Sequence, residues 1–231
     1  MKRKRAADTD HSQKGIFMSC EGDNYYLRNK LKLDDALQSW RKDPVVQAVR
    51  NIGVRPKSIL EIGCGNGWRL HALANRYKAG CCGIDPSEEA VNAGRHLFPS
   101  LSFVQATADN IPYENNRFDL VILGFCLYLC DRKDLFKIAC EVDRVLADGG
   151  KLAILDFSPP FPYRNPYSHY PGIFSYKMAY GDLFAWNPAY FVVYQHVFAS
   201  PPENMEKVDE RVSVIVLSKQ MEGAYPDSPY Q

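Results

Sequence analysis

The feature that most constrains the fold is a short apolar run that ends in three glycines and leads into a helical segment. Ser58 to Ile62 has the composition of a buried strand, Gly63, Gly65 and Gly67 follow it, and Trp68 to Lys78 has helical character. Because glycine has no Cβ, such a turn lets the backbone bend sharply and bring its N–H groups against a ligand, while the helix N-terminus adds partial positive charge. The sequence therefore predicts a ligand that sits directly on this turn.

A second acidic position specifies that ligand further. Gly80 to Asp85 is typical of a short strand with a carboxylate at its end, where doubly wound α/β folds hold a ribose through its hydroxyls. Asp85 lies 22 positions after Gly63. The turn has the spacing G-x-G-x-G, preceded by Glu61, whereas dinucleotide sites have G-x-G-x-x-G. We therefore predict a nucleoside cofactor without a pyrophosphate.

Four motifs in this order resemble those of class I S-adenosylmethionine-dependent methyltransferases of the small-molecule type, similar to methyltransferase domain 11. The motifs are Glu61–Gly67, Asp85–Ser87, Ile111–Val121 and Arg144–Leu152. The resemblance implies an α/β fold with a doubly wound, Rossmann-like seven-stranded sheet, in the order 3-2-1-4-5-7-6 with strand 7 antiparallel. It also implies the cofactor S-adenosyl-L-methionine and the product S-adenosyl-L-homocysteine.

The same resemblance assigns residues to the cofactor. Ala106 to Asn110 stands where the family reads adenine through a side-chain acceptor, and because the family's usual Gly-Asp-Ala is absent, the acceptor moves to Asp109. We expect Arg28 to clamp a carboxylate of the methionine moiety or of the acceptor, since guanidinium bonds carboxylate through two parallel N–H groups. The expected cofactor-binding residues are Glu61, Gly63, Cys64, Gly65, Asp85, Pro86, Thr107, Ala108, Asp109, Gly124 and Arg28.

The chain divides into a tail and one domain. Residues 1–13 are basic and then polar, with the run Lys2 to Arg5 at their head, and are expected to be disordered; residues 14–231 form a single methyltransferase domain. Within it, residues 14–50 show partial amphipathic stripes and predict a helical cap over the cofactor cleft. Residues 158–187 are rich in Pro, Tyr, Arg and His and are interpreted as a substrate lid, because long loops at the carboxyl ends of strands usually carry specificity.

Apolar segments predict the remaining elements. Phe118 to Phe125 is nearly all apolar, as expected of a central parallel strand covered on both faces. The other strands are expected at Leu101–Gln105, Lys151–Phe157, Tyr190–Phe198 and Arg211–Lys219, and further helices at Ser87–His96 and Asp134–Leu146.

The chemistry expected is in-line methyl transfer, in which the protein positions the nucleophile and excludes water. The (Asp/Asn)-Pro-Pro-(Tyr/Phe) sequence typical of methyltransferases that modify base amino groups is missing after the fourth strand, and Ser158 to Phe161 has a similar sequence one strand too late. The basic and aromatic roof favours a small anionic or sugar-like acceptor and O-methylation. His169 is the candidate base and Tyr128 a candidate to face the methyl group, each with a purely structural role as the alternative. The expected substrate-binding residues are Tyr25, Arg164, Tyr170 and Lys177.

Composition excludes several classes. The net charge of +1 gives no bulk field for nucleic acid or an anionic membrane, and no long apolar run or signal peptide is present, so we expect a cytoplasmic protein without membrane or nucleic-acid partners. The seven cysteines contain no C-x-x-C pair and are expected to be reduced thiols, with no metal site. The partner is a small-molecule substrate, and the chain is a monomer or a homodimer.

Three alternatives stay open at this point. The strand, glycine and acid layout also fits an NAD(P)-dependent oxidoreductase. The lack of an assignable catalytic residue fits a catalytically silent subunit that binds S-adenosylmethionine and needs a partner chain. A methyltransferase acting on RNA rests only on Lys2 to Arg5, and the near-neutral charge argues against it.

Overall fold

The computed structural model describes residues 12–199 and 201–230, so the basic run Lys2–Arg5 lies outside the described residues. The end of the predicted tail was wrong at residues 12 and 13. Ser12 caps helix α1 (Gln13–Ile16), and the Gln13 side chain is buried and donates a hydrogen bond to the Leu129 carbonyl oxygen at 2.8 Å. A buried amide is stable only with such partners, which the sequence does not reveal.

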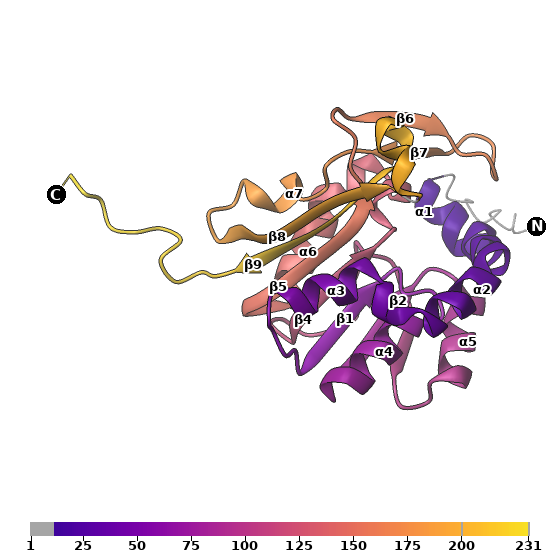
Figure 1. The fold of residues 1–231 in the computed structure, drawn as a ribbon, viewed down its shortest axis with the longest axis horizontal. Coiled ribbons are helices and arrows are strands. Elements are labelled where there is room, and N and C mark those ends of the chain that lie inside the picture. Colours follow the sequence, from indigo (N-terminus) through magenta and orange to yellow (C-terminus); the bar gives the residue numbers. More distant parts are fainter. Residues whose placement is uncertain (1–11, 200, 231) are drawn as a thin grey trace, which may run out of the picture.

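The centre of the structure is one seven-stranded sheet in the order β3-β2-β1-β4-β5-β9-β8 (Figure 1). Strand β9 runs antiparallel to both β5 and β8, and the other neighbouring pairs are parallel. Since β8 and β9 are the sixth and seventh strands of this sheet, the predicted order 3-2-1-4-5-7-6 is confirmed. The strands are β1 (Ser58–Ile62), β2 (Gly80–Asp85), β3 (Ser102–Gln105), β4 (Phe118–Gly124), β5 (Leu146–Phe157), β8 (Tyr190–Ala199) and β9 (Arg211–Lys219).

Helices cover both faces of the sheet, because its central strands are apolar on both sides. Side chains alternate between the faces along each strand: Leu60 packs in the core with Ile138, whereas Ile59 packs in the core with Leu70. One face carries α3 (Pro44–Asn51), α4 (Trp68–Tyr77) and α5 (Glu88–Leu97), and the other carries α6 (Leu135–Val145) and α7 (Asp182–Ala185).

The N-terminal segment is helical and is fixed to the start of α5. A Cβ on Gly22 would lie 2.6 Å from the Phe17 carbonyl oxygen and 3.2 Å from the Ser87 nitrogen, so only glycine allows this approach. Asp23 accepts hydrogen bonds from the Ser87 hydroxyl at 2.7 Å and the Glu89 N–H at 3.0 Å. The segment consists of α1, the π-helical turn η1 (Phe17–Glu21), α2 (Gly22–Gln38) and η2 (Trp40–Lys42).

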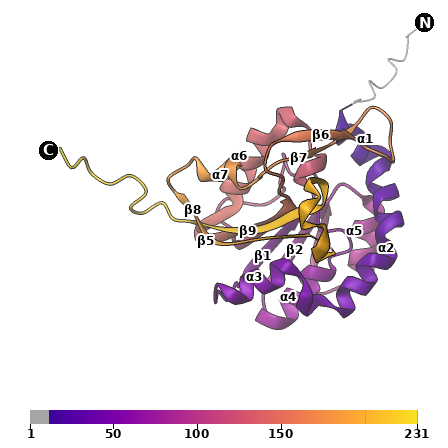
Figure 2. The same cartoon turned by 45° about the horizontal axis from the view of Figure 1, so that its top comes forward.

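Residues 158–187 contain an antiparallel hairpin of β6 (Tyr163–Pro166) and β7 (Phe174–Lys177), which lies beside α1 in Figure 2. Gln13 bonds both backbone groups of Phe174, at 2.9 and 3.1 Å. On the other side, Asp209 in the turn η6 (Val208–Glu210) accepts from Asn165 at 3.1 Å. Sequence reasoning missed this hairpin, since its short strands show no hydrophobic alternation.

Two strand boundaries differ from the prediction. Leu146 pairs with Phe118 and Lys151 pairs with Leu120, so β5 begins at Leu146 and not at the predicted Lys151. The residues between them form a bulge within the strand, with Gly149 at φ +77°. Strand β4 ends at Gly124 because Phe125 has a φ of +50°.

The other short turns are η3 (Leu127–Leu129), η4 (Arg132–Asp134) and η5 (Pro202–Glu206). In the described part of the chain, no helix has the length and apolarity that a membrane span requires.

Candidate cofactor and acceptor sites

The glycine turn between β1 and α4 requires glycine for two reasons. Gly63, Gly65 and Gly67 have φ values of +72°, +54° and +78°, which L side chains rarely adopt. A Cβ would also lie 2.7 Å from the Cys126 Cβ at Gly63, and 2.3 Å from the Phe103 ring at Gly67. The chain is therefore shaped at this turn as the sequence predicted.

Asp85 ties this turn to the next helix. Its carboxylate accepts hydrogen bonds from the Gly65 N–H at 2.8 Å and the Ser87 N–H at 2.9 Å. Burial raises the pKa of Asp85 to about 6, although these two backbone hydrogen bonds favour the ionised form. The carboxylate thus lies at the carboxyl end of β2, on the edge of the cavity described next.

A cavity lies beside the glycine turn, at the carboxyl ends of β1, β2 and β4. It contains six of the eleven expected cofactor residues: Gly63, Asp85, Pro86, Thr107, Ala108 and Asp109. Sequence reasoning missed several others, which come from the N-terminal segment and from the segment after β4: Lys14, Phe17, Gly22, Phe125, Cys126, Leu129 and Cys130. Only tertiary packing brings these two segments together.

Asp109 is joined to the N-terminal segment across this cavity. Its carboxylate accepts from Lys14 at 2.8 Å and from Lys137 of α6 at 3.2 Å. Burial opposes ionisation, but the hydrogen bonds from Lys14, Thr107 and Lys137 outweigh it and lower the pKa of Asp109 to about 2. Asp109, which is expected to accept a hydrogen bond from adenine, is therefore ionised and bound by two lysines.

Four expected cofactor residues of the turn region do not line the cavity. Gly65 donates to Asp85, and the Cys64 thiol points toward Gly83 of β2. Glu61 lies under the turn, where it pairs with Arg69 of α4; burial raises the pKa of Glu61 to about 7, and the guanidinium limits that rise. Gly124 leaves room for the same pair, since a Cβ there would lie 2.8 Å from the Arg69 Nη1.

Arg28 also lies away from the cavity. Its guanidinium pairs with Glu21, which is 1% exposed, and donates to the Tyr167 hydroxyl at 3.1 Å. The Tyr167 hydroxyl in turn donates to Glu21 at 2.9 Å. Arg28 therefore clamps a carboxylate of its own chain and ties the N-terminal segment to the loop of the β6–β7 hairpin.

A second cavity adjoins the first and shares Tyr25 with it. It contains four residues expected to act on the acceptor, Tyr25, Tyr128, His169 and Lys177. The hydroxyls of Tyr25 and Tyr128 lie 3.4 Å apart, and burial raises the pKa of both tyrosines. We call this the acceptor cavity.

The other two expected substrate residues, Arg164 and Tyr170, do not line the acceptor cavity. The Arg164 guanidinium is exposed and lies over the Phe174 ring, at 4.2 Å from its centroid. Asn165, its neighbour in β6, lines the acceptor cavity. Arg164 therefore faces the outer side of the hairpin, because side chains alternate along a strand.

The first cavity, which we call the cofactor cavity, fits S-adenosylmethionine. Gly63 lines it without a side chain, and Asp85, Thr107 and Ala108, which are expected to hold the ribose and the adenine, line it as well. Four aspartates line the cavity and suit the positive sulfonium: Asp85, Asp109, Asp131 and Asp134. Among the residues described, no group of three or more metal-ligating side chains comes together.

Comparison with known proteins agrees with this geometry. A family model described as a methyltransferase domain matches residues 59–150. A demethylmenaquinone methyltransferase of Bacillus cereus (strain AH187) is 30% identical over 174 residues, which cover 71% of this chain and 70% of that protein. A fatty-acid O-methyltransferase of Mycolicibacterium smegmatis is 34% identical over 111 residues, covering 47% of this chain and 40% of that protein. The first three curated relatives, this one included, are matched over only part of their own length: 40%, 52% and 53%.

Solved structures show the same fold. The 1,6-didemethyltoxoflavin-N1-methyltransferase of Burkholderia thailandensis, solved with 1,6-didemethyltoxoflavin and S-adenosylhomocysteine, has a TM-score of 0.69 at 16% identity and covers 95% of this chain and 93% of its own. The matches favour a methyltransferase over an oxidoreductase and confirm the family and cofactor expected from the motifs. The chain belongs to the S-adenosylmethionine-dependent methyltransferases.

Proposed function

We propose that this chain catalyses O-methylation of a small anionic or sugar-like acceptor with S-adenosylmethionine. The observation that carries the proposal is the position of Tyr25, which lines both the cofactor cavity and the acceptor cavity. A group transferred between two bound molecules needs such a junction, because the reacting atoms must lie about 3 to 3.5 Å apart.

Each cavity has its own task. Gly63, Asp85 and the backbone at Thr107 and Ala108 would hold the cofactor, which supplies an electrophilic methyl group on a sulfonium. The hydroxyls of Tyr25 and Tyr128 orient the acceptor oxygen from the other side. The β6–β7 hairpin and its loop line the acceptor cavity.

His169 supports oxygen as the acceptor atom. It lines the acceptor cavity and is exposed, and its ring lies 5.4 Å from that of Tyr167 in an edge-to-face arrangement. The imidazole would take the proton of the acceptor hydroxyl and pass it to solvent. The relatives' names include carbon, oxygen and nitrogen methyltransferases, so the proposal rests on this site and not on their acceptors.

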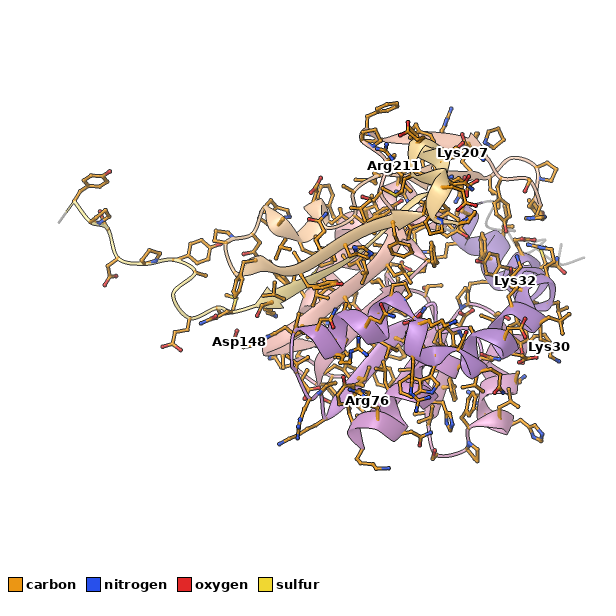
Figure 3. All side chains as sticks on the ribbon, in the orientation of Figure 1. Lys30, Lys32, Arg76, Asp148, Lys207 and Arg211 are labelled. Carbon is orange, nitrogen blue, oxygen red and sulfur yellow. The ribbon has the colours of Figure 1, made fainter. Side chains whose placement is uncertain are left out.

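The test begins with calorimetric titration of S-adenosylhomocysteine into the full chain and into Asp85→Ala. Removal of a carboxylate that orients the turn and faces a ribose should weaken binding about tenfold to a hundredfold. Asp148→Ala is the control, since Asp148 lies at the far end of the sheet (Figure 3). Radiolabelled methyl transfer into pools of small acids and sugars follows; binding without transfer to any pool would instead favour a catalytically silent cofactor-binding subunit.

A further inference from the structure

The acceptor cavity differs from the cofactor cavity in charge. Four aspartates line the cofactor cavity, whereas none of the eleven residues around the acceptor cavity is acidic. One lysine, Lys177, lines the acceptor cavity and is 8% exposed. An amine acceptor would find no counter-charge in this cavity, while an anion would find a partly buried ammonium.

The Lys177 ammonium has one N–H that donates to no described oxygen or nitrogen atom. It donates to the backbone oxygen of Asp209 at 2.9 Å and to its carboxylate at 3.1 Å, and it lies 4.0 Å from the centroid of the Phe157 ring. An ammonium has three N–H donors, and in residues 12–199 and 201–230 only these two oxygen atoms accept a hydrogen bond from it. The Asp209 side chain is 59% exposed, so this counter-ion is largely screened by water.

The remaining lining is rich in hydrogen-bonding side chains, and some of their groups have no partner among the described residues. Nine of the eleven lining residues have a side chain that can hydrogen-bond. The amides of Asn29 and Asn165 donate to Tyr25 and Asp209, which leaves their oxygens free as acceptors within the described part of the chain. Ser168 and Ser175 make no side-chain hydrogen bond there. A fatty chain or a bare aromatic ring would leave these groups unpaired, whereas sugar hydroxyls would engage them.

The two lining residues without a polar side chain are Phe157 and Pro166. The Phe157 ring stands edge to face with Tyr128, with 5.1 Å between the ring centroids. Such apolar surfaces suit the C–H face of a sugar ring and leave its hydroxyls to the polar side chains.

We propose that the acceptor is an acidic sugar, a hydroxylated ring whose carboxylate or phosphate binds Lys177 and whose hydroxyls bind the asparagines and serines of the acceptor cavity. This inference rests on the proposed function, since it names the acceptor of that site. It gives Lys177 the role of an anion receptor and Asp209 that of its competing counter-ion.

The experiment measures binding, with the full chain saturated with S-adenosylhomocysteine. Glucuronate, galacturonate and glucose 1-phosphate are titrated by calorimetry, with the methyl ester of glucuronate and glucose as neutral partners. 4-Hydroxybenzoate and octanoate represent aromatic and aliphatic acids. At least one acidic sugar should bind about tenfold or more tightly than its neutral partner and more tightly than either other acid, because a charge-assisted hydrogen bond is lost in the ester. Whether a uronate or the sugar phosphate binds more tightly identifies the anionic group of the acceptor as a carboxylate or a phosphate.

Two variants should change this affinity in opposite directions. Lys177→Met should weaken acidic-sugar binding about tenfold to a hundredfold, whereas Asp209→Asn, which keeps an oxygen acceptor for Lys177 but removes the competing charge, should tighten it about twofold to fivefold. Lys32→Met is the control, on the exposed side of α2 (Figure 3). Circular dichroism checks that each variant is folded, and Asp209→Asn alone still tests the idea if Lys177→Met does not fold.

Three results would overturn the inference: no saturable binding of any acidic sugar, no acidic sugar that binds more tightly than its neutral partner, or tighter binding of 4-hydroxybenzoate or octanoate. Unchanged affinity in Asp209→Asn and folded Lys177→Met would do the same. Failure of S-adenosylhomocysteine itself to bind would refute the proposed function, so the two failures are distinguishable.

Discussion

Replacement of Arg69 by methionine tests how the glycine turn is supported from below. Arg69 is 8% exposed and carries the only positive charge that pairs, within the described residues, with Glu61. It also binds Asp43 through two hydrogen bonds of 3.1 and 3.0 Å and lies 4.8 Å from the centroid of the Trp68 ring. Arg69→Met keeps most of the apolar volume but leaves two buried carboxylates without a counter-charge.

The expected cost is large. Removal of one partner from a buried ion pair costs about 3 to 5 kcal/mol, because the remaining charge stays desolvated. In a chain of this size each kcal/mol corresponds to roughly 2 to 4 °C in the melting temperature. We therefore expect Arg69→Met to melt roughly 6 to 20 °C below the wild type at pH 7.5, by the same two estimates.

The pH dependence of folding stability provides a second test. The folded pKa of Glu61 is raised from 4.5 to about 7, so the folded state holds a proton that the unfolded state has lost, and this group makes stability fall as pH rises from 4.5 to about 7. Without the guanidinium the folded pKa rises further, so the fall should continue above pH 7 in Arg69→Met. Glu61→Gln, added to that variant, should recover part of the loss and flatten the curve.

Thermal and urea unfolding, followed by circular dichroism from pH 5 to 9, measure both effects. Arg76→Met is the matched control, because Arg76 lies on the same helix and is exposed (Figure 3). If Arg69→Met is no less stable than Arg76→Met, or if its stability does not fall between pH 7 and 9, the account of the turn's support is refuted.

Two further predictions concern the turn and the acceptor cavity. Gly67→Ala should destabilise the chain by about 1 to 3 kcal/mol more than Gly149→Ala in urea unfolding. Both glycines have nearly the same φ, +78° and +77°, but only at Gly67 does a Cβ meet the Phe103 ring, so equal losses would contradict the packing argument. His169→Gln should lower kcat about a hundredfold without changing S-adenosylhomocysteine affinity, as expected for a general base, while His196→Gln on β8 should leave kcat unchanged. A higher KM at unchanged kcat would assign His169 to acceptor binding only.

The sequence identified four of the residues that line the acceptor cavity. Tyr25, Tyr128, His169 and Lys177 were all expected to face the acceptor, and all four line the same cavity. Arg164 was expected with them but lies outside it. In the hairpin, Tyr163 pairs with Lys177 and Arg164 pairs with Tyr176, so Arg164 and Lys177 stand on opposite faces. Without the hairpin's register, the two cations could not be told apart.

By itself the sequence determined the sheet order, the glycine turn and the place of Asp85, because these depend on local backbone demands and on apolar runs that only a doubly wound sheet buries. The side of the strand that faces the cofactor cavity became clear only from the structure: Ile62 lines the cavity, and Glu61, its neighbour, faces away from it because strand side chains alternate. Only the tertiary structure decided that Lys14 reaches Asp109, 95 positions away. The same holds for the hydrogen bond from Arg28 to Tyr167, 139 positions away, because no local pattern encodes which distant side chains come into contact.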